Sequence, residues 1–229
     1  MGTTFRRMAF LQHSATDVPG VLGVFATGLG LEVSAHRADL GASRLPAAGS
    51  FDLLVVMGSV ESVTDARVSW IDPERNLVAR SVETDVPVLG VCFGGQLLAE
   101  VLGGTVGRAS RPEIGWRLLD TTDDSCIPAG PWLDWHHDAF TCPPGAEAVA
   151  TTDVSLHAFV QGPHTGVQFH PEVTLAVVDS WIGDAREQAD LSEAEIDALR
   201  AGFDTRGRGP DGLSRALFEG WLDRAGSRG

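Results

Sequence analysis

The sequence predicts an α/β protein with a doubly wound, mostly parallel sheet, flanking helices and a small antiparallel addition. In the first half of the chain, short apolar runs typical of buried strands alternate with amphipathic stretches typical of helices. Such alternation builds strand–helix–strand units and therefore a parallel sheet. Gly58, Cys92 and His170 each follow an apolar run. Ligands on such sheets gather outside the carboxyl ends of the strands, so these positions favour the same fold.

The first half of the chain supplies the alternating elements in order. Runs of apolar and β-branched residues bounded by turn residues predict strands, and longer stretches with apolar residues at helical spacing predict helices. We therefore expect strands at residues 8–12, 31–36, 52–57 and 86–91, and helices at residues 18–28, 68–84 and 96–102.

The segment from residue 105 to 160 is richer in prolines and turn residues, and it predicts short strands added to the sheet in antiparallel fashion. Residues 153–160 and 164–169 flank a Gln-Gly-Pro turn. This pattern predicts a hairpin whose second strand delivers His170 to its carboxyl end.

Helical spacing returns near the C-terminus. We expect helices at residues 175–184, 192–202 and 213–224, the second of them opened by a capping box of Ser192 and Glu195. The whole chain, residues 1–229, is expected to form a single domain with a C-terminal helical extension from about residue 175.

Composition limits the classes of partner. The 229 residues are 43% hydrophobic, enough for a sizeable core, and the formal net charge is −14. Nucleic-acid affinity comes largely from clustered Lys and Arg, so nucleic acid is not expected as a partner. No apolar run approaches the length of a membrane span, and the N-terminus lacks the pattern of a secretory signal. We expect a soluble cytoplasmic protein without a membrane partner.

The lysine and cysteine content of the chain excludes several kinds of chemistry and of site. The chain contains no lysine, so Schiff-base chemistry and the lysine-containing phosphate loop of many nucleotide hydrolases are both excluded. The three cysteines, Cys92, Cys126 and Cys142, show no C-x-x-C spacing, so neither a disulfide framework nor a zinc site is indicated. We expect no cofactor and no metal.

Cys92 lies where a nucleophile is expected, at the junction of an apolar strand and an amphipathic helix. A strand that turns directly into a helix holds one side chain out over the sheet, and little bulk fits two residues to either side. Both of those positions are glycine, Gly90 and Gly94. The helix N-terminus favours a thiolate, and the N–H of Phe93 is placed to face a developing oxyanion.

His170 and Glu172 end an apolar strand near the other end of the chain. Side chains two residues apart in an extended segment point to the same side. Pro171 lies between them, lacks an N–H for a ladder and biases His170 towards an extended conformation. His170 could then deprotonate Cys92 while Glu172 orients the imidazole, which is the logic of a catalytic triad with sulfur as nucleophile.

At these two motifs the chain resembles the class I glutamine amidotransferases, whose nucleophile lies in a G-x-C-x-G-x-Q run and whose histidine and glutamate lie in an H-P-E run. Residues 57–63 resemble the oxyanion segment of the family, and residues 113–116 and 135–138 resemble its later landmarks. The resemblance covers residues 8–175 and is closest to the amidotransferase domain of GMP synthase and stand-alone proteins similar to it. It implies a flavodoxin-like fold and hydrolysis of a γ-glutamyl amide through a thioester on Cys92.

The resemblance also implies roles for further residues. Ser59 and Phe93 would supply the N–H donors of the oxyanion hole. Gly58, Gln96 and His136 would contact the substrate, which is glutamine or another γ-glutamyl small molecule.

The chain departs from the family pattern at residues 58–60, which read Gly-Ser-Val where the family usually has Gly-Gly-Pro. If this backbone requires a positive φ, Ser59 would cost about 1 kcal/mol relative to glycine. We therefore expect activity with altered substrate geometry. Other positions stay open: Glu113 and Trp116 either line the cleft or stabilise a strand, and Asp138 either shapes the rim or makes a local hydrogen bond.

Three functions are compatible with these residues. The leading hypothesis is a glutamine amidotransferase, or glutaminase, whose ammonia passes to a separate synthase. The second is a stand-alone γ-glutamyl hydrolase or peptidase, which would use the same thioester on γ-glutamyl conjugates. The third is a non-catalytic binding protein, which the intact Cys92, His170 and Glu172 disfavour.

Overall fold

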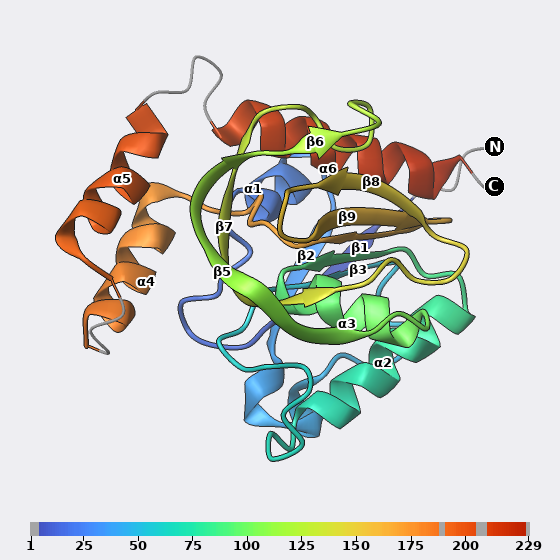
Figure 1. Ribbon diagram of the computed structural model, residues 1–229. Coiled ribbons are helices and arrows are strands. Elements are labelled where there is room, and N and C mark those ends of the chain that lie inside the picture. Colours follow the sequence, from blue (N-terminus) through green and yellow to red (C-terminus); the bar gives the residue numbers. More distant parts are fainter. Residues whose placement is uncertain (1–4, 188–190, 205–209, 228–229) are drawn as a thin grey trace.

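The central feature of the fold is one sheet covered by helices on both faces (Figure 1). The computed structural model describes residues 5–187, 191–204 and 210–227. Within these residues, eight strands form the sheet in the order β2-β1-β3-β4-β10-β9-β8-β6. They are β1 (Arg7–Gln12), β2 (Glu32–Arg37), β3 (Leu53–Val56), β4 (Val88–Val91), β6 (Asp120–Thr121), β8 (Glu147–Thr151), β9 (Leu156–Gln161) and β10 (His164–Val167).

The direction of the strands divides this sheet into two parts. Strands β2, β1, β3, β4 and β10 are parallel to one another, whereas β9, β8 and β6 continue the sheet in antiparallel fashion. The expected hairpin is present, because β9 and β10 pair through the turn at residues 161–164. The doubly wound, mostly parallel sheet predicted from the sequence is confirmed.

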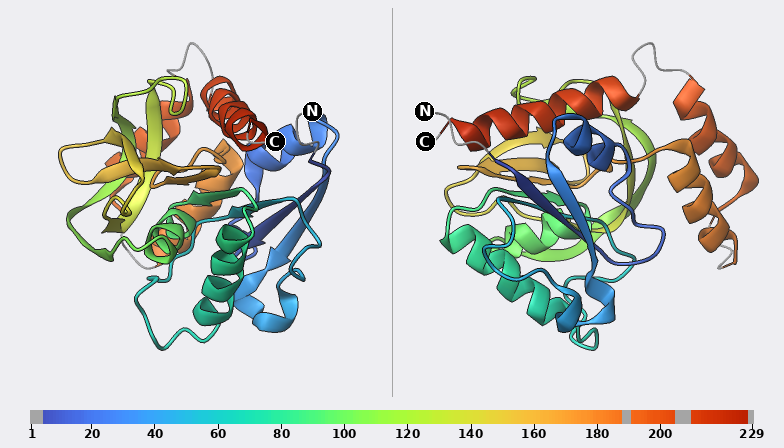
Figure 2. Two further views of the ribbon diagram at one scale, coloured as in Figure 1. Left: turned by 90° about the vertical axis from the view of Figure 1, so that its right-hand side faces the viewer. Right: turned by 180° about the vertical axis from the view of Figure 1, so that it is seen from behind.

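Helices pack on the two faces of the parallel strands. Besides two short 3-10 turns at Ala38–Leu40 and Ala42–Arg44, the helices are α1 (Gly20–Gly28), α2 (Ile71–Glu83), α3 (Phe93–Val101), α4 (Leu175–Glu187), α5 (Glu193–Asp204) and α6 (Pro210–Gly226). Figures 1 and 2 show α1 and α6 together on one face of the sheet and α2 and α3 on the other.

Alternate residues of each parallel strand enter opposite layers, as the period-two geometry of a strand requires. On β1, Met8 and Phe10 join the core cluster that contains the apolar residues of α1 and α6. Ala9 and Leu11 join the cluster that contains those of α2 and α3. These side chains are fully buried, so β1 is apolar on both faces, as expected for a covered parallel sheet.

A separate two-stranded ribbon, β5 (Val106–Leu118) and β7 (Pro131–Phe140), curves around one side of the sheet (Figure 1). The expectation of short strands is wrong here, since the two strands have 13 and 10 residues. The prolines do not interrupt them: Pro112 lies where the register shifts between Arg108 and Glu113, and Pro131 begins β7. Proline is tolerated at bulges and strand ends because no ladder N–H is needed there.

The helices α4 and α5 pack against this ribbon rather than against the sheet. Their apolar residues form a third cluster with Leu133 of β7, and the indole N–H of Trp116 on β5 donates to the Leu199 carbonyl at 2.8 Å. The capping box that opens α5 is present, since the Glu195 carboxylate accepts the Ser192 N–H at 2.8 Å. Trp116 therefore packs against α5 and holds it on the ribbon. Of the two alternatives left open for Trp116, these contacts favour a structural role.

Several boundaries differ from those expected. α3 begins at Phe93 rather than residue 96, because the chain turns into the helix directly after Cys92. α1 begins at Gly20 after Pro19, and α2 begins at Ile71 because residues 68–70 lie in turns. Among the described residues, no helix is long and apolar enough to cross a membrane.

Candidate active site

Cys92 lies in the tight turn between β4 and α3 and has an unusual backbone. Its φ is 51° and its ψ is −107°, a region that non-glycine residues rarely occupy and that marks functional sites. The packing agrees with the predicted need for glycine on both sides. A Cβ at Gly90 would lie 2.3 Å from the Gly94 oxygen, and one at Gly94 would lie 2.1 Å from the Val56 oxygen. The turn therefore closes only around small residues.

His170 and Glu172 follow β10, the parallel neighbour of β4. The Nδ1 atom of His170 lies 2.8 Å from Glu172 Oε1, and both side chains are almost fully buried. The backbone is held as well, because His170 N donates to the Leu133 carbonyl at 2.8 Å. Within the part of the chain that the structure describes, His170 Nε2 has no hydrogen-bond partner. One ring nitrogen is thus oriented and the other is available for proton transfer.

The environment of His170 favours its protonated form. Burial alone would lower the pKa of the imidazole, but the Glu172 carboxylate and the Cys92 sulfur together raise that pKa well above its usual value. The indole of Trp181 on α4 packs edge-on against the ring, with centroids 4.8 Å apart. The sequence does not single out Trp181, because an aromatic residue in an amphipathic helix indicates only packing.

Gly58 brings the segment after β3 next to the side chains of Cys92 and His170. A Cβ at Gly58 would lie 3.0 Å from His170 Cε1 and 3.7 Å from Cys92 Cβ, so a side chain there would crowd the imidazole. Among the described residues, no acceptor takes the N–H of Ser59 or that of Phe93. Ser59 does not adopt a positive φ, so the local strain considered from the sequence is absent at this residue.

Gln96 is buried in the first turn of α3, not exposed on the helix surface. Its amide donates to the Asp138 carbonyl at 3.1 Å and to Gln168 Oε1 at 3.3 Å. The amide of Gln168 in turn lies 3.6 Å from Cys92 Sγ. Gln96 is therefore linked to Cys92 through Gln168, a residue that sequence reasoning missed, and its contact with substrate stays a prediction.

His136 lies in the interior of the ribbon, not at an exposed rim. Its Nδ1 pairs with the Asp138 carbonyl at 3.0 Å, and its Nε2 lies 3.5 Å from Glu113 Oε2. Burial, with the charge of His157 added, lowers the pKa of His136 to about 4. Its role in substrate binding stays a prediction, whereas the neighbouring His137 is exposed.

Glu113, His136 and His157 lie close enough together to be considered as metal ligands. Glu113, however, already accepts hydrogen bonds from His157 at 3.0 Å, from the Ser155 hydroxyl at 3.0 Å and from the Thr152 hydroxyl at 3.1 Å. The carboxylate is thus filled by protein donors, and hydrogen bonds account for the cluster. Of the two open readings for Glu113, stabilisation of the ribbon fits these contacts.

His13 and Glu74 form a buried pair that sequence reasoning missed. His13 Nε2 lies 3.0 Å from Glu74 Oε1, and His13 Nδ1 lies 2.7 Å from the Gly58 carbonyl oxygen. Neither side chain is exposed. His13 directly follows β1, so the signal that selected Cys92 and His170 could have found it. Glu74 lies within α2 and has no comparable signal.

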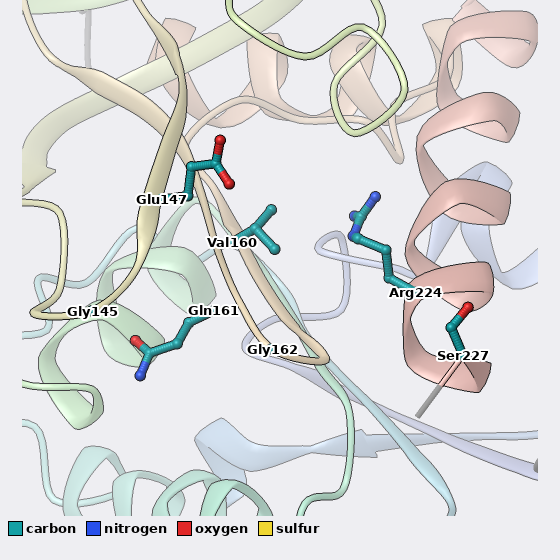
Figure 3. A pocket seen from close by; sticks show the side chains of 7 residues that line it. All are labelled: Gly145, Glu147, Val160, Gln161, Gly162, Arg224 and Ser227. Atoms are coloured by element: carbon teal, nitrogen blue, oxygen red, sulfur yellow. The ribbon is translucent and has the colours of Figure 1, made fainter. Parts of the chain in front are cut away.

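Two surface hollows lie away from Cys92. One, of about 410 Å³, surrounds the turn between β9 and β10 (Figure 3). That turn is at the amino end of β10, whereas Cys92 follows the carboxyl end of the parallel strand β4. A second, of about 360 Å³, is lined mainly by residues 63–75. The chemistry of Cys92 and His170 therefore identifies the site better than surface shape does.

A family model matches most of the chain. The model described as "Glutamine amidotransferase class-I" matches residues 25–182. The chain is also 35% identical over 192 residues to the glutamine-hydrolyzing GMP synthase of Aeropyrum pernix, covering 72% of this chain and 36% of that protein. It is 33% identical to one subunit of the glutamine-hydrolyzing GMP synthase of Sulfurisphaera tokodaii, covering 54% of this chain and 68% of that subunit. The chain thus spans about a third of the length of the first relative.

Solved structures match over nearly the whole chain. A glutamine amido transferase from Methylobacillus flagellatus superposes with a TM-score of 0.86 and 25% identity, covering 96% of each chain. A glutamine amidotransferase from Thermotoga maritima superposes with a TM-score of 0.84 at 21% identity, a likeness of fold, covering 98% of this chain and all of that one. These matches extend over the C-terminal helices as well as the sheet.

Proposed function

Since the chain belongs to the class I glutamine amidotransferases, we propose that it hydrolyses the side-chain amide of glutamine through a γ-glutamyl thioester on Cys92 and supplies ammonia to a separate synthase. One observation carries the proposal. His170 has one ring nitrogen paired with Glu172 and the other without a partner among the described residues, beside a cysteine held in a strained turn.

In the proposed acylation step, Cys92 is the nucleophile and His170 moves the proton. His170 Nε2 takes the thiol proton, and the sulfur attacks the amide carbon of glutamine. The carbonyl oxygen becomes an oxyanion, for which we propose the N–H groups of Phe93 and Ser59 as donors. The imidazolium then gives its proton to the amide nitrogen, the C–N bond breaks and ammonia leaves. Glu172 holds Nδ1 and stabilises the charged ring during this exchange.

The proposed deacylation step returns the enzyme to its starting form. His170 takes a proton from water, and the oxygen attacks the thioester carbon. The C–S bond then breaks, glutamate leaves, and the proton on His170 returns to the sulfur. The same two N–H donors serve the second oxyanion, so the site works twice in each turnover.

A synthase partner is supported by the relatives. The Sulfurisphaera tokodaii protein is named as one subunit of a GMP synthase, a name that implies another subunit in that protein. We propose that this chain likewise delivers ammonia to a separate protein chain.

A second candidate function is hydrolysis of γ-glutamyl conjugates without a partner. It is favoured by Trp181, which packs against His170, and by Trp135, which packs against Trp181 with ring centroids 5.8 Å apart. An aromatic surface next to the reacting histidine would suit an apolar amine leaving group, whereas ammonia needs none.

The test is to measure ammonia release from glutamine and amine release from a panel of γ-glutamyl conjugates by wild type and Cys92→Ala. Cys142→Ala is the matched control, because Cys142 is a free thiol that is only partly buried. We expect slow glutaminase activity that disappears in Cys92→Ala alone. A conjugate cleaved much faster than glutamine would favour the second candidate. Activity that survives in Cys92→Ala would refute the thioester mechanism.

A further inference from the structure

The buried pair of His13 and Glu74 lies directly behind the segment that carries Ser59. The His13 ring joins the Glu74 carboxylate on one side to the Gly58 carbonyl oxygen on the other, at 3.0 and 2.7 Å. From this arrangement, and resting on the proposed function, we propose that His13, held by Glu74, is a positioning residue that aims the Ser59 N–H at the oxyanion.

The argument follows from the geometry of the Gly58–Ser59 peptide. No peptide bond among the described residues is cis, so the Gly58 C=O and the Ser59 N–H point in opposite directions across a planar unit. The carbonyl is directed at His13, in the interior. The Gly58 Cα lies beside Cys92 and His170. Drawing the carbonyl inward therefore turns the N–H outward, towards the side on which the amide of a substrate would react.

Protonation of His13 strengthens its hydrogen bond to the Gly58 carbonyl oxygen. Both of its partners are acceptors, a carboxylate and a peptide carbonyl, so both bonds form only when both ring nitrogens carry a proton. Burial lowers the pKa of His13, but Glu74 and the Gly58 carbonyl more than offset it, and the pKa is raised. A bond between a buried cation and a carbonyl is costly to break, because the charge would lose a partner that water cannot replace.

Packing fixes the ring itself. His13 stacks on Trp70 with centroids 4.9 Å apart and an angle of 20° between the planes. It also contacts the ring of Phe93, at 4.8 Å between centroids. Phe93 carries the other free N–H of the site, so one imidazole supports both halves of the oxyanion hole, one by a hydrogen bond and one by packing.

The test separates oxyanion stabilisation from reactivity of the thiol. Hydrolysis of glutamine and of γ-glutamyl p-nitroanilide passes through an oxyanion, whereas alkylation of Cys92 by iodoacetamide does not. Both would be measured on the full chain for wild type, His13→Leu, His13→Asn and Glu74→Gln, with alkylation at Cys92 followed by mass spectrometry. His36→Leu, a histidine on the edge strand β2, is the matched control.

We expect His13→Leu to lower kcat for both substrates by about 10- to 100-fold, with KM and the alkylation rate within about threefold of wild type. His13→Asn keeps a donor for the Gly58 carbonyl and should recover part of the loss. Glu74→Gln should lower kcat less than His13→Leu.

Two results would overturn the inference while the proposed function stands. The first is a kcat of His13→Leu equal to that of wild type. The second is an equal fall of kcat and of the alkylation rate in every variant, which would mean that His13 is needed only for the site to fold. If wild type shows no Cys92-dependent hydrolysis of either substrate although iodoacetamide reaches Cys92, the proposed function itself fails, and the inference falls with it.

Discussion

Among the buried histidines that stand beside carboxylates, His170 after β10 and His157 in β9 differ in an instructive way. His170 uses one ring nitrogen, which Glu172 holds at 2.8 Å. His157 lies between two carboxylates, with Glu113 at 3.0 Å from Nε2 and Asp134 at 3.3 Å from Nδ1. Where His157 has a second carboxylate, His170 has the Cys92 sulfur as its neighbour.

The difference teaches that the second neighbour, a carboxylate or a thiol, separates these two rings, and not burial or the direction of the pKa shift. Both rings are buried, and neighbouring carboxylates raise the pKa of both against the opposing effect of burial. A ring between two carboxylates links β9 to the ribbon. A ring with one carboxylate is oriented but can still exchange a proton.

The largest effect that this comparison predicts is on catalysis. His170→Gln removes the group that moves the proton, and kcat for Cys92-dependent hydrolysis should fall by about 10³-fold or more. Circular dichroism and the thermal midpoint should stay close to those of wild type. A fall of less than tenfold would show that another group carries the proton and that His170 Nε2 is not required for the reaction.

For His157 the comparison predicts a loss of stability without a comparable fall in kcat. His157→Leu leaves Glu113 and Asp134 buried without their shared cation, and breaking such a pair costs about 3–5 kcal/mol in the free energy of unfolding. Urea unfolding would measure this, and kcat per folded molecule should change only a few fold. If kcat fell while stability was unchanged, His157 would take part in the reaction, and the distinction between His157 and His170 would be wrong.

The smallest effect concerns His136, which lies beside this network and is held neutral. Its pKa is lowered to about 4 in the folded chain, whereas an unfolded histidine titrates near 6.5. Between these values the unfolded chain binds more protons than the folded one. This contribution to stability is therefore intact above pH 6.5 and is lost as pH falls towards 4, by about 3 kcal/mol at most. Urea unfolding from pH 7 to pH 4 should show a shallower decline for His136→Gln, and identical slopes would contradict the assignment.

Sequence reasoning found the parts of the site whose signal is local. The turn at Cys92 needs small neighbours two residues away, and Gly90 and Gly94 are visible in the sequence. His170 and Glu172 are likewise a motif of adjacent positions, and the alternation of strands and helices placed both motifs at the same edge of the sheet. These features are determined by residues within one turn or one strand.

The rest of the site depends on contacts between distant segments. Glu74 meets His13 across 61 positions, and Gln168 meets Gln96 across 72. A glutamate inside an amphipathic helix looks like any solvated residue until the helix is packed over the end of β1. The length of the ribbon was missed for a related reason, because Pro112 signals a break locally but is accommodated by a register shift between two strands.

The position of β10 has a consequence for the order in which the chain is made. This strand is inserted between β4 and β9, and it pairs Thr165 with Leu89 across a long stretch of sequence. A ribosome delivers Cys92 well before His170. Cys92 and His170 can therefore be brought together only after the hairpin of β9 and β10 has been made. Until then Cys92 has no His170 beside it, so the order of synthesis delays their pairing until most of the sheet has been made.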